Sequence, residues 1–410
     1  MNNTLPPMLT LVLLAIGVIW KFSHGSPAIR KSAGLVVIGI FSWALVFMPY
    51  SFEADPSNLF LAGAILLSGF CTFLSQNNSQ QASEIYSSAM IILALSLGVL
   101  LSPPIVSNIF LGGFLGFIAI SINREQHNTF RTKLIFLHIA IAILFTLTSA
   151  FSGETLKTFA NLFLAVTFLP LVPFHLPFVG IIKDADGSLS SCWIVVWLAI
   201  GLGKLIMVYS ELTTGMLYTL SLLALMSAVY ASLASLGQRL NRLFVASATI
   251  AHVALVWGLL EVFPSFPKWG IPFGITLALV MGGISLAFSF IQHRYGWKTL
   301  GILPGLASPM PRFGVVMVLL VGFALFLPLF VTFSGLMVMP TIVVQDVEIL
   351  MISFLFLVVW LGSGWYFIKM LHQTAFGEAR SDVPYSDLRS AEFVAVWALL
   401  LGATYSGIIL

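Results

Sequence analysis

Four ionisable side chains fall inside apolar stretches that are long enough to cross a membrane: Lys204, His138, His175 and His252. A charged side chain near the centre of a bilayer is costly, so the few that proteins keep there commonly have a function. An amine taken out of water loses part of its preference for the charged form, and imidazole titrates close to neutral pH. Together these residues form a candidate proton relay.

Each of the four also has a simpler interpretation. Lys204 precedes Glu211 by a helical distance of roughly 10 Å, and a lysine stem can extend along such a distance to reach an interface. A lone histidine in a membrane can simply hydrogen-bond a neighbouring helix. His252 lies near the middle of its apolar stretch and His138 near the end of its own. The two interpretations stay open for all four residues.

His175 lies in a segment that interrupts its own helix. Residues 168–178 read FLPLVPFHLPF, with Pro170, Pro173 and Pro177 around the histidine. Proline removes a backbone hydrogen bond, and in lipid the freed carbonyl groups need protein or water as partners. Broken membrane helices often line cavities and ion paths. We therefore expect a polar pocket at this break, lined by His175.

A second segment resembles the first. Residues 168–174 read FLPLVPF and residues 326–333 read FLPLFVTF, with Pro328 in the second copy. The two copies lie in the seventh and twelfth apolar stretches, and stretches five apart run in opposite directions. This arrangement predicts an inverted repeat in which spans 4–8 match spans 9–13, with helices 7 and 12 both broken.

The composition places the chain in a membrane. Hydrophobic residues make up 59% of it, charged residues 8%, and the mean hydropathy is +1.04, whereas a soluble domain is about a quarter charged. Cys71 and Cys192 are far apart in apolar segments, so we expect packing roles and neither a disulfide nor a metal site. The sequence contains no phosphate-binding loop, metal-binding motif or nucleic-acid-binding stretch, and the start of the chain is not typical of a signal peptide.

The sequence predicts an all-α polytopic membrane protein with about fourteen transmembrane helices. A Pro103-Pro104 pair divides one long apolar run into two of them. We expect four parts: N-terminal helices 1–3 in residues 1–85, the first repeat in 86–212, the second repeat in 213–372, and a C-terminal loop and helix in 373–410. The predicted spans lie near residues 6–22, 34–50, 58–75, 86–101, 104–122, 132–150, 156–182, 189–210, 214–237, 241–262, 271–292, 313–338, 347–371 and 391–410.

The positive charges support this count. With the spans alternating in direction, fifteen of the 18 lysines and arginines fall in loops on one side, and Lys157 and Lys268 fall on the other. Positive charge is retained on the cytoplasmic side, so both termini are predicted to face outward. The longest loops, near 293–312 and 372–390, would then be cytoplasmic. The second of them is polar enough to contact a partner, or it is a solvated connector.

Three stretches resemble the antiporter-like membrane subunits of respiratory complex I, of multisubunit cation/proton antiporters and of membrane-bound hydrogenases. They are VPFHLPF at 172–178, LASLGQRLNRLFVASATIAHVAL at 233–255, and GFALFLPLFVTFSG at 322–335. The first is similar to the family's broken seventh helix, the second to its tenth and the third to its broken twelfth. The likeness extends over roughly residues 85–340 and implies a proton or sodium path through buried charges.

Most of the charges that the resemblance implies are missing. The family's fifth-helix glutamate corresponds to the neighbourhood of Phe117, its seventh-helix lysine to Phe168, and its twelfth-helix lysine to Leu336. The eighth-helix lysine is retained as Lys204. The sequence therefore predicts, at most, a reduced relay that combines Lys204 with the membrane histidines.

The resemblance implies a proton-translocating subunit of a complex I-like energy-coupling complex in a bacterial inner membrane. One alternative is a structural subunit that lost its pumping charges, and another is the membrane subunit of an inorganic-carbon uptake complex with a cytosolic zinc partner. A stand-alone transporter is the least favoured. The expected partners are other membrane subunits, a cytoplasmic protein and lipid, with no nucleic acid. We expect no cofactor and no catalysis in this chain, although an oxidoreductase complex could contain it.

Overall fold

The structure is a computed structural model of the 410-residue chain. It describes residues 5–23, 25–47, 55–77, 80–122, 129–261, 263, 265–338 and 346–408. Within these ranges, the side chains at 5, 80–81, 328, 330–338, 346–353 and 408 are left out of the description. The side chain of Leu336 is one of these, so the position where the resemblance implies a lysine in the antiporter-like subunits lies outside the described residues.

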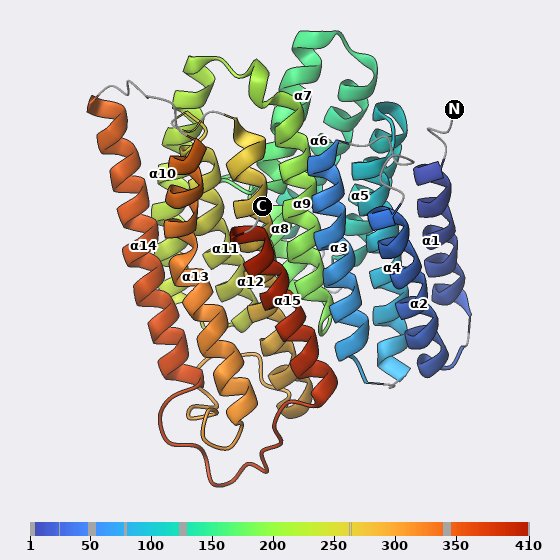
Figure 1. Ribbon diagram of the computed structural model, residues 1–410, viewed down its shortest axis with the longest axis vertical. Coiled ribbons are helices and arrows are strands. Elements are labelled where there is room, and N and C mark those ends of the chain that lie inside the picture. Colours follow the sequence, from blue (N-terminus) through green and yellow to red (C-terminus); the bar gives the residue numbers. More distant parts are fainter. Residues whose placement is uncertain are drawn as a thin grey trace.

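The chain folds into a bundle of long helices that run up and down along one direction (Figure 1). An isolated bridge between Leu240 and Thr299 is the β-type pairing in the described part of the chain. The helices are α1 (Leu5–Phe22), α2 (Pro27–Phe47), α3 (Pro56–Ser75), α4 (Gln80–Leu101), α5 (Pro104–Ser121), α6 (Phe130–Phe151), α7 (Glu154–Phe168), α8 (Leu176–Asp184), α9 (Leu189–Val208), η3 (Tyr209–Glu211), α10 (Thr214–Gly237), α11 (Asn241–Gly258), α12 (Phe266–Tyr295), α13 (Pro311–Val338), α14 (Asp346–Thr374) and α15 (Ser390–Ile408).

These helices confirm the predicted all-α membrane fold. Among the described residues, 9 helices are long and apolar enough to cross a membrane, and Pro6–Phe22 and Pro311–Leu327 are shorter apolar helices. Helices satisfy every backbone group internally, which is what a lipid environment requires. The count of fourteen crossings stays a prediction. Of the predicted domain boundaries, those at 85 and 372 fall inside α4 and α14, and the boundary at 212 falls between η3 and α10.

Helices α9 and α12 form the centre of the bundle. The apolar part of α12 is buried throughout and that of α9 nearly so. Helix α12 packs against α9, α13 and α15, whereas α9 also packs against α3, α4 and α7. Helices α1 and α2 lie at one edge of the bundle and α14 at the opposite edge (Figure 1). A helix that is apolar on all sides is suited to this central position.

Only one of the two predicted breaks interrupts a helix in the described residues. Helix α7 ends at Phe168 and α8 begins at Leu176, as the three prolines predict. Helix α13 instead runs without interruption through position 328, and α12 likewise continues through Pro272. A single proline removes one hydrogen bond and can be accommodated within a helix, whereas three within eight residues leave too few bonds to continue it.

The basic loops meet at one end of the bundle. Lys31 Nζ donates to the carbonyl oxygens of Leu74 at 2.9 Å and Gln76 at 2.7 Å, and Arg242 donates to Lys183 O at 3.3 Å. These contacts join the ends of α2, α3, α8 and α11 that the alternating topology assigns to the same side. The segments 296–310 and 375–389 lie together at this end, at the bottom of the view in Figure 1.

Candidate functional site

The break between α7 and α8 is stabilised by tryptophan side chains from neighbouring helices. Trp197 Nε1 on α9 donates to Thr167 O at 3.1 Å, and Trp257 Nε1 on α11 donates to Leu169 O at 3.0 Å. Ser227 Oγ on α10 accepts a hydrogen bond from Val172 N at 2.8 Å. Three backbone groups at the break are thus bonded to side chains of neighbouring helices.

Packed aromatic rings surround this break. The Phe168 ring centroid lies 5.0 Å from that of Trp197 and 6.0 Å from that of Phe114 on α5. Trp193 extends the cluster, with centroid distances of 5.5 Å to Phe114 and 6.1 Å to Phe117. We call these five residues the aromatic cluster. Where the resemblance places a buried glutamate and lysine in other members, near Phe117 and at Phe168, this chain packs aromatic rings.

A cavity of about 890 Å³ opens at the basic end of the bundle. It lies between the ends of α3, α4, α5, α8, α9, α12 and α15, and its lining reaches Phe117 and Trp193 of the aromatic cluster. The polar lining includes Lys21, Gln76, Glu84, Asp184, Asp186, His293 and Glu392. The cavity therefore extends from the basic end as far as two rings of the aromatic cluster.

His138 and His175 lie close to the break. His138 Nε2 and Thr167 Oγ1 are 3.0 Å apart, and the His138 ring packs 6.0 Å from that of Phe174. His175 is 8% exposed, its ring lies edge-on to Tyr230 at 5.5 Å, and its buried Nδ1 has no hydrogen-bond partner among the described residues. The structure thus brings two of the four candidate residues to the same segment.

His252 lies on α11, where it faces α14. Its Nδ1 is 2.9 Å from Ala248 O and 3.3 Å from the Tyr366 hydroxyl, and its ring packs against Phe367. Its Nε2 is buried without a described hydrogen-bond partner. His252 is fully buried and its described hydrogen-bond contacts involve other residues than those of His138 and His175.

Lys204 is buried near one end of α9, with 3% of its surface exposed. Its Nζ donates to Asn108 Oδ1 on α5 at 3.3 Å. Asn58 on α3 faces the neighbouring Gly203, and its Oδ1 is buried without a partner in the described residues. The amine therefore lies in an amide-lined site, and it does not extend to Glu211, which instead hydrogen-bonds Thr158.

The sequence does not indicate that Trp197, Trp257, Ser227 and Asn108 belong to this site. A tryptophan inside an apolar span carries an N–H that needs an acceptor, and a broken helix supplies carbonyl acceptors. That pairing is a usable signal, but it does not state which tryptophan meets which carbonyl. The predicted polar pocket at the break is, in the described residues, mostly aromatic, with His175 at its edge.

Comparison with known proteins identifies the fold. No protein-family model and no curated protein sequence matches the chain. A chain of respiratory complex I from Thermus thermophilus with bound NADH is similar with a TM-score of 0.77 and 15% sequence identity, over 98% of this chain and 95% of that one. A chain of the Mrp complex from a Dietzia species is similar with a TM-score of 0.75 and 13% identity, over 98% and 94%.

An archaeal complex extends this set. A chain of the membrane-bound sulfane sulfur reductase, an archaeal respiratory membrane complex, has a TM-score of 0.71 and 14% identity, over 99% of this chain and 76% of that one. The resemblance read from the sequence thus has a structural counterpart. The chain has the same overall fold as these chains of respiratory complex I, the Mrp complex and the membrane-bound sulfane sulfur reductase.

Proposed function

We propose that this chain is an antiporter-like subunit of a multisubunit energy-coupling complex, and that it connects other subunits without conducting ions itself. The similar structures are chains of multisubunit membrane complexes. The observation that supports the absence of ion conduction is the aromatic cluster, in which Phe117 and Trp193 line the cavity at the basic end while Phe168 and Trp197 pack at the break. Closely packed apolar rings offer no site for a proton or a hydrated cation.

The same proposal includes orientation and location. The basic end faces the cytoplasm because positive loops are retained there, so both termini face outward. A bacterial inner membrane fits this arrangement. A cytoplasmic partner would meet the surface formed by segments 296–310 and 375–389, which are joined by hydrogen bonds such as Ala307 N to Ala375 O at 2.9 Å.

Purification from native membranes tests the first part. A mild-detergent extract of cells that contain the tagged chain should yield a stable assembly with other membrane subunits, identified by mass spectrometry. Redox subunits would indicate a complex I-like or hydrogenase-like assembly, and a zinc-containing cytosolic protein would indicate inorganic-carbon uptake. Isolation of the chain as a monomer from several mild detergents would contradict the proposal.

A reduced proton relay is the second candidate function, and the site of Lys204 favours it. The amine is buried, its described partner is an amide, and a second amide oxygen, from Asn58, faces the neighbouring Gly203 without a described partner. Amide oxygens accept hydrogen bonds from a protonated amine. Because they carry no net charge, they do not cancel its positive charge. In this candidate, Lys204 would exchange protons with His175, His252 and His138.

The two candidates predict opposite results for Lys204→Met in the intact complex. If the chain does not conduct, the proton-coupled activity of the complex should stay within about twofold of the wild type, because methionine fills a similar volume. If the relay operates, the activity should fall roughly tenfold or more, and Lys204→Arg should not restore it. Lys157→Met, at a partly exposed lysine, is the matched control, and proton uptake by reconstituted vesicles is the measurement.

A further inference from the structure

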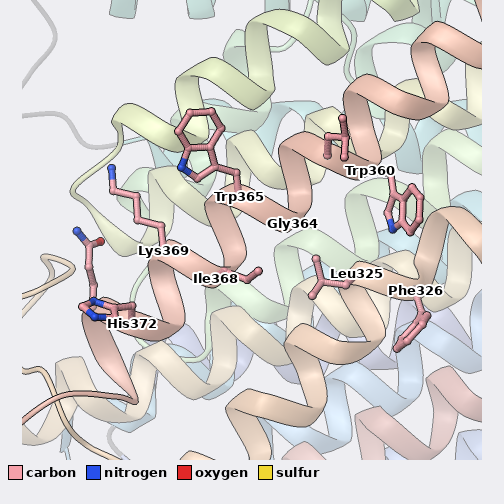
Figure 2. Close-up of a pocket in the computed structure, with 10 residues that line it drawn as sticks. Leu325, Phe326, Trp360, Gly364, Trp365, Ile368, Lys369 and His372 are labelled. Atoms are coloured by element: carbon pink, nitrogen blue, oxygen red, sulfur yellow. The ribbon is translucent and has the colours of Figure 1, made fainter.

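A groove of about 860 Å³ runs along the outer surface between α13 and α14 (Figure 2). Its wall on α14 is formed by side chains spaced three or four residues apart, which share one face of the helix. Most of them are exposed, among them Trp365 at 70% and Ile368 at 61%. The lining residues are Leu325, Phe326, Trp360, Leu361, Gly364, Trp365, Ile368, Lys369, His372 and Gln373.

Gly364 leaves the groove open. A methyl group added at Gly364 would meet no atom within 4 Å, so the backbone of α14 borders free space at this point. Figure 2 shows Phe326 and Trp360 toward one end of the groove and Lys369 and His372 toward the other. The groove is therefore apolar along its length and basic at one end.

A second hollow of about 650 Å³ adjoins the basic end and shares Lys369 and Gln373 with the groove. Arg239, from the segment between α10 and α11, also lines it. Lys369 Nζ donates to Leu236 O at 2.7 Å, which holds the amine at this junction. No acidic residue is found among the described residues that line the groove or the hollow. Two cations thus face an open space that offers them no counter-ion.

We propose that the groove and the hollow together bind one anionic phospholipid of the surrounding membrane. An acyl chain lies along α14 over Gly364, and the phosphate lies between Lys369 and Arg239, with His372 beside it. Basic pockets between transmembrane helices bind anionic head groups, and tryptophan is favoured at the level of the head groups. Trp365 lies one helical turn from Lys369 on the same face and occupies this level.

The chemistry favours a lipid over a helix from another subunit. A second transmembrane helix would cover the apolar groove, but it would leave the cations of the adjoining hollow without partners. A phospholipid matches both parts, because it combines an apolar chain with a negative head group. This proposal does not depend on whether the chain conducts ions or on which complex contains it.

Lipid analysis of the purified protein tests the proposal. The full assembly is purified in detergent, and its retained phospholipids are identified by native mass spectrometry and by extraction and quantification. Arg239→Gln combined with Lys369→Gln should reduce the retained anionic phospholipid roughly tenfold or more. Gly364→Phe should reduce it to a similar extent, because the ring fills the groove. Retained phosphatidylethanolamine, which carries no net charge, should not change in the charge variant.

Matched variants separate lipid binding from general effects. Gly39→Phe adds the same ring at an exposed glycine of α2 whose surroundings are open, like those of Gly364 on α14. Lys21→Gln combined with Arg380→Gln removes two positive charges elsewhere. Both should retain lipid like the wild type, and the size-exclusion profiles of all four proteins should match. Unchanged anionic lipid in the Arg239/Lys369 variant would overturn the proposal. So would a structure of the assembly with a protein helix in the groove.

Discussion

Replacing Trp257 with alanine is expected to lower the free energy of unfolding by about 3–5 kcal/mol, as for other buried large-to-small substitutions. Trp257 is fully buried, and its indole N–H is the donor to Leu169 O in the break between α7 and α8. The substitution leaves a cavity and removes the partner of a carbonyl group in an apolar environment. Unfolding in mixed detergent–SDS micelles, followed by circular dichroism, measures the change.

Trp257→Phe separates the two contributions. Phenylalanine retains most of the ring but lacks the donor, so the expected loss is about 1–3 kcal/mol for an unsatisfied buried carbonyl. Trp365→Phe is the matched control, because Trp365 is 70% exposed on the outer surface, and it should change stability by less than about 0.5 kcal/mol. Equal stability of the two phenylalanine variants would mean that the Leu169 carbonyl does not depend on the indole.

The fold could be predicted from the sequence because the membrane restricts the possibilities. Helices α10 and α11 begin at the predicted residues, Thr214 and Asn241, since long apolar stretches must be helical in lipid. The break after Phe168 followed from three closely spaced prolines. Position 328 shows the limit of that reasoning, because α13 passes through it although its local sequence resembles the break.

The site could be predicted only in part. Lys204, His175 and His252 are buried, as expected for ionisable residues inside apolar spans. The sequence does not show that Trp197 and Trp257 would approach the break, because these contacts join helices that are far apart in the chain. The broken helix predicts a polar pocket because its freed carbonyl groups need polar groups or water as partners. Indole N–H groups meet the same requirement and leave the surroundings apolar.

The indole partners at the break also bear on whether the subunit conducts ions. The three prolines favour an ion path if a purely structural subunit has no need for a broken helix. In the structure the break has its own packing function: it turns the carbonyls of Thr167 and Leu169 toward Trp197 and Trp257, which joins α7 to α9 and α11. A broken helix is thus compatible with a subunit that does not conduct, and the substitution at Lys204 becomes the deciding experiment.

The second large effect is expected at the basic end of the bundle, at the ion pair between Arg294 and Glu392. The two side chains are 10% and 6% exposed, and Glu392 also accepts a hydrogen bond from Arg389 N at 2.8 Å. Arg294 lies in the last turn of α12 and Glu392 in the first turn of α15, where each charge also interacts favourably with the dipole of its helix. The pair therefore joins the central helix to the last one.

Glu392→Leu should lower the free energy of unfolding by about 3–5 kcal/mol, because it leaves Arg294 charged and buried without its partner. Adding Arg294→Met should recover most of this loss, since two apolar side chains of similar size need no counter-charge. Asp382→Asn, in the exposed pair with Arg380, is the control and should leave the unfolding midpoint unchanged. If the double variant were no more stable than Glu392→Leu, the loss would come from the packing and capping of α15 by Glu392. In that case the ion pair would not be what connects α12 and α15.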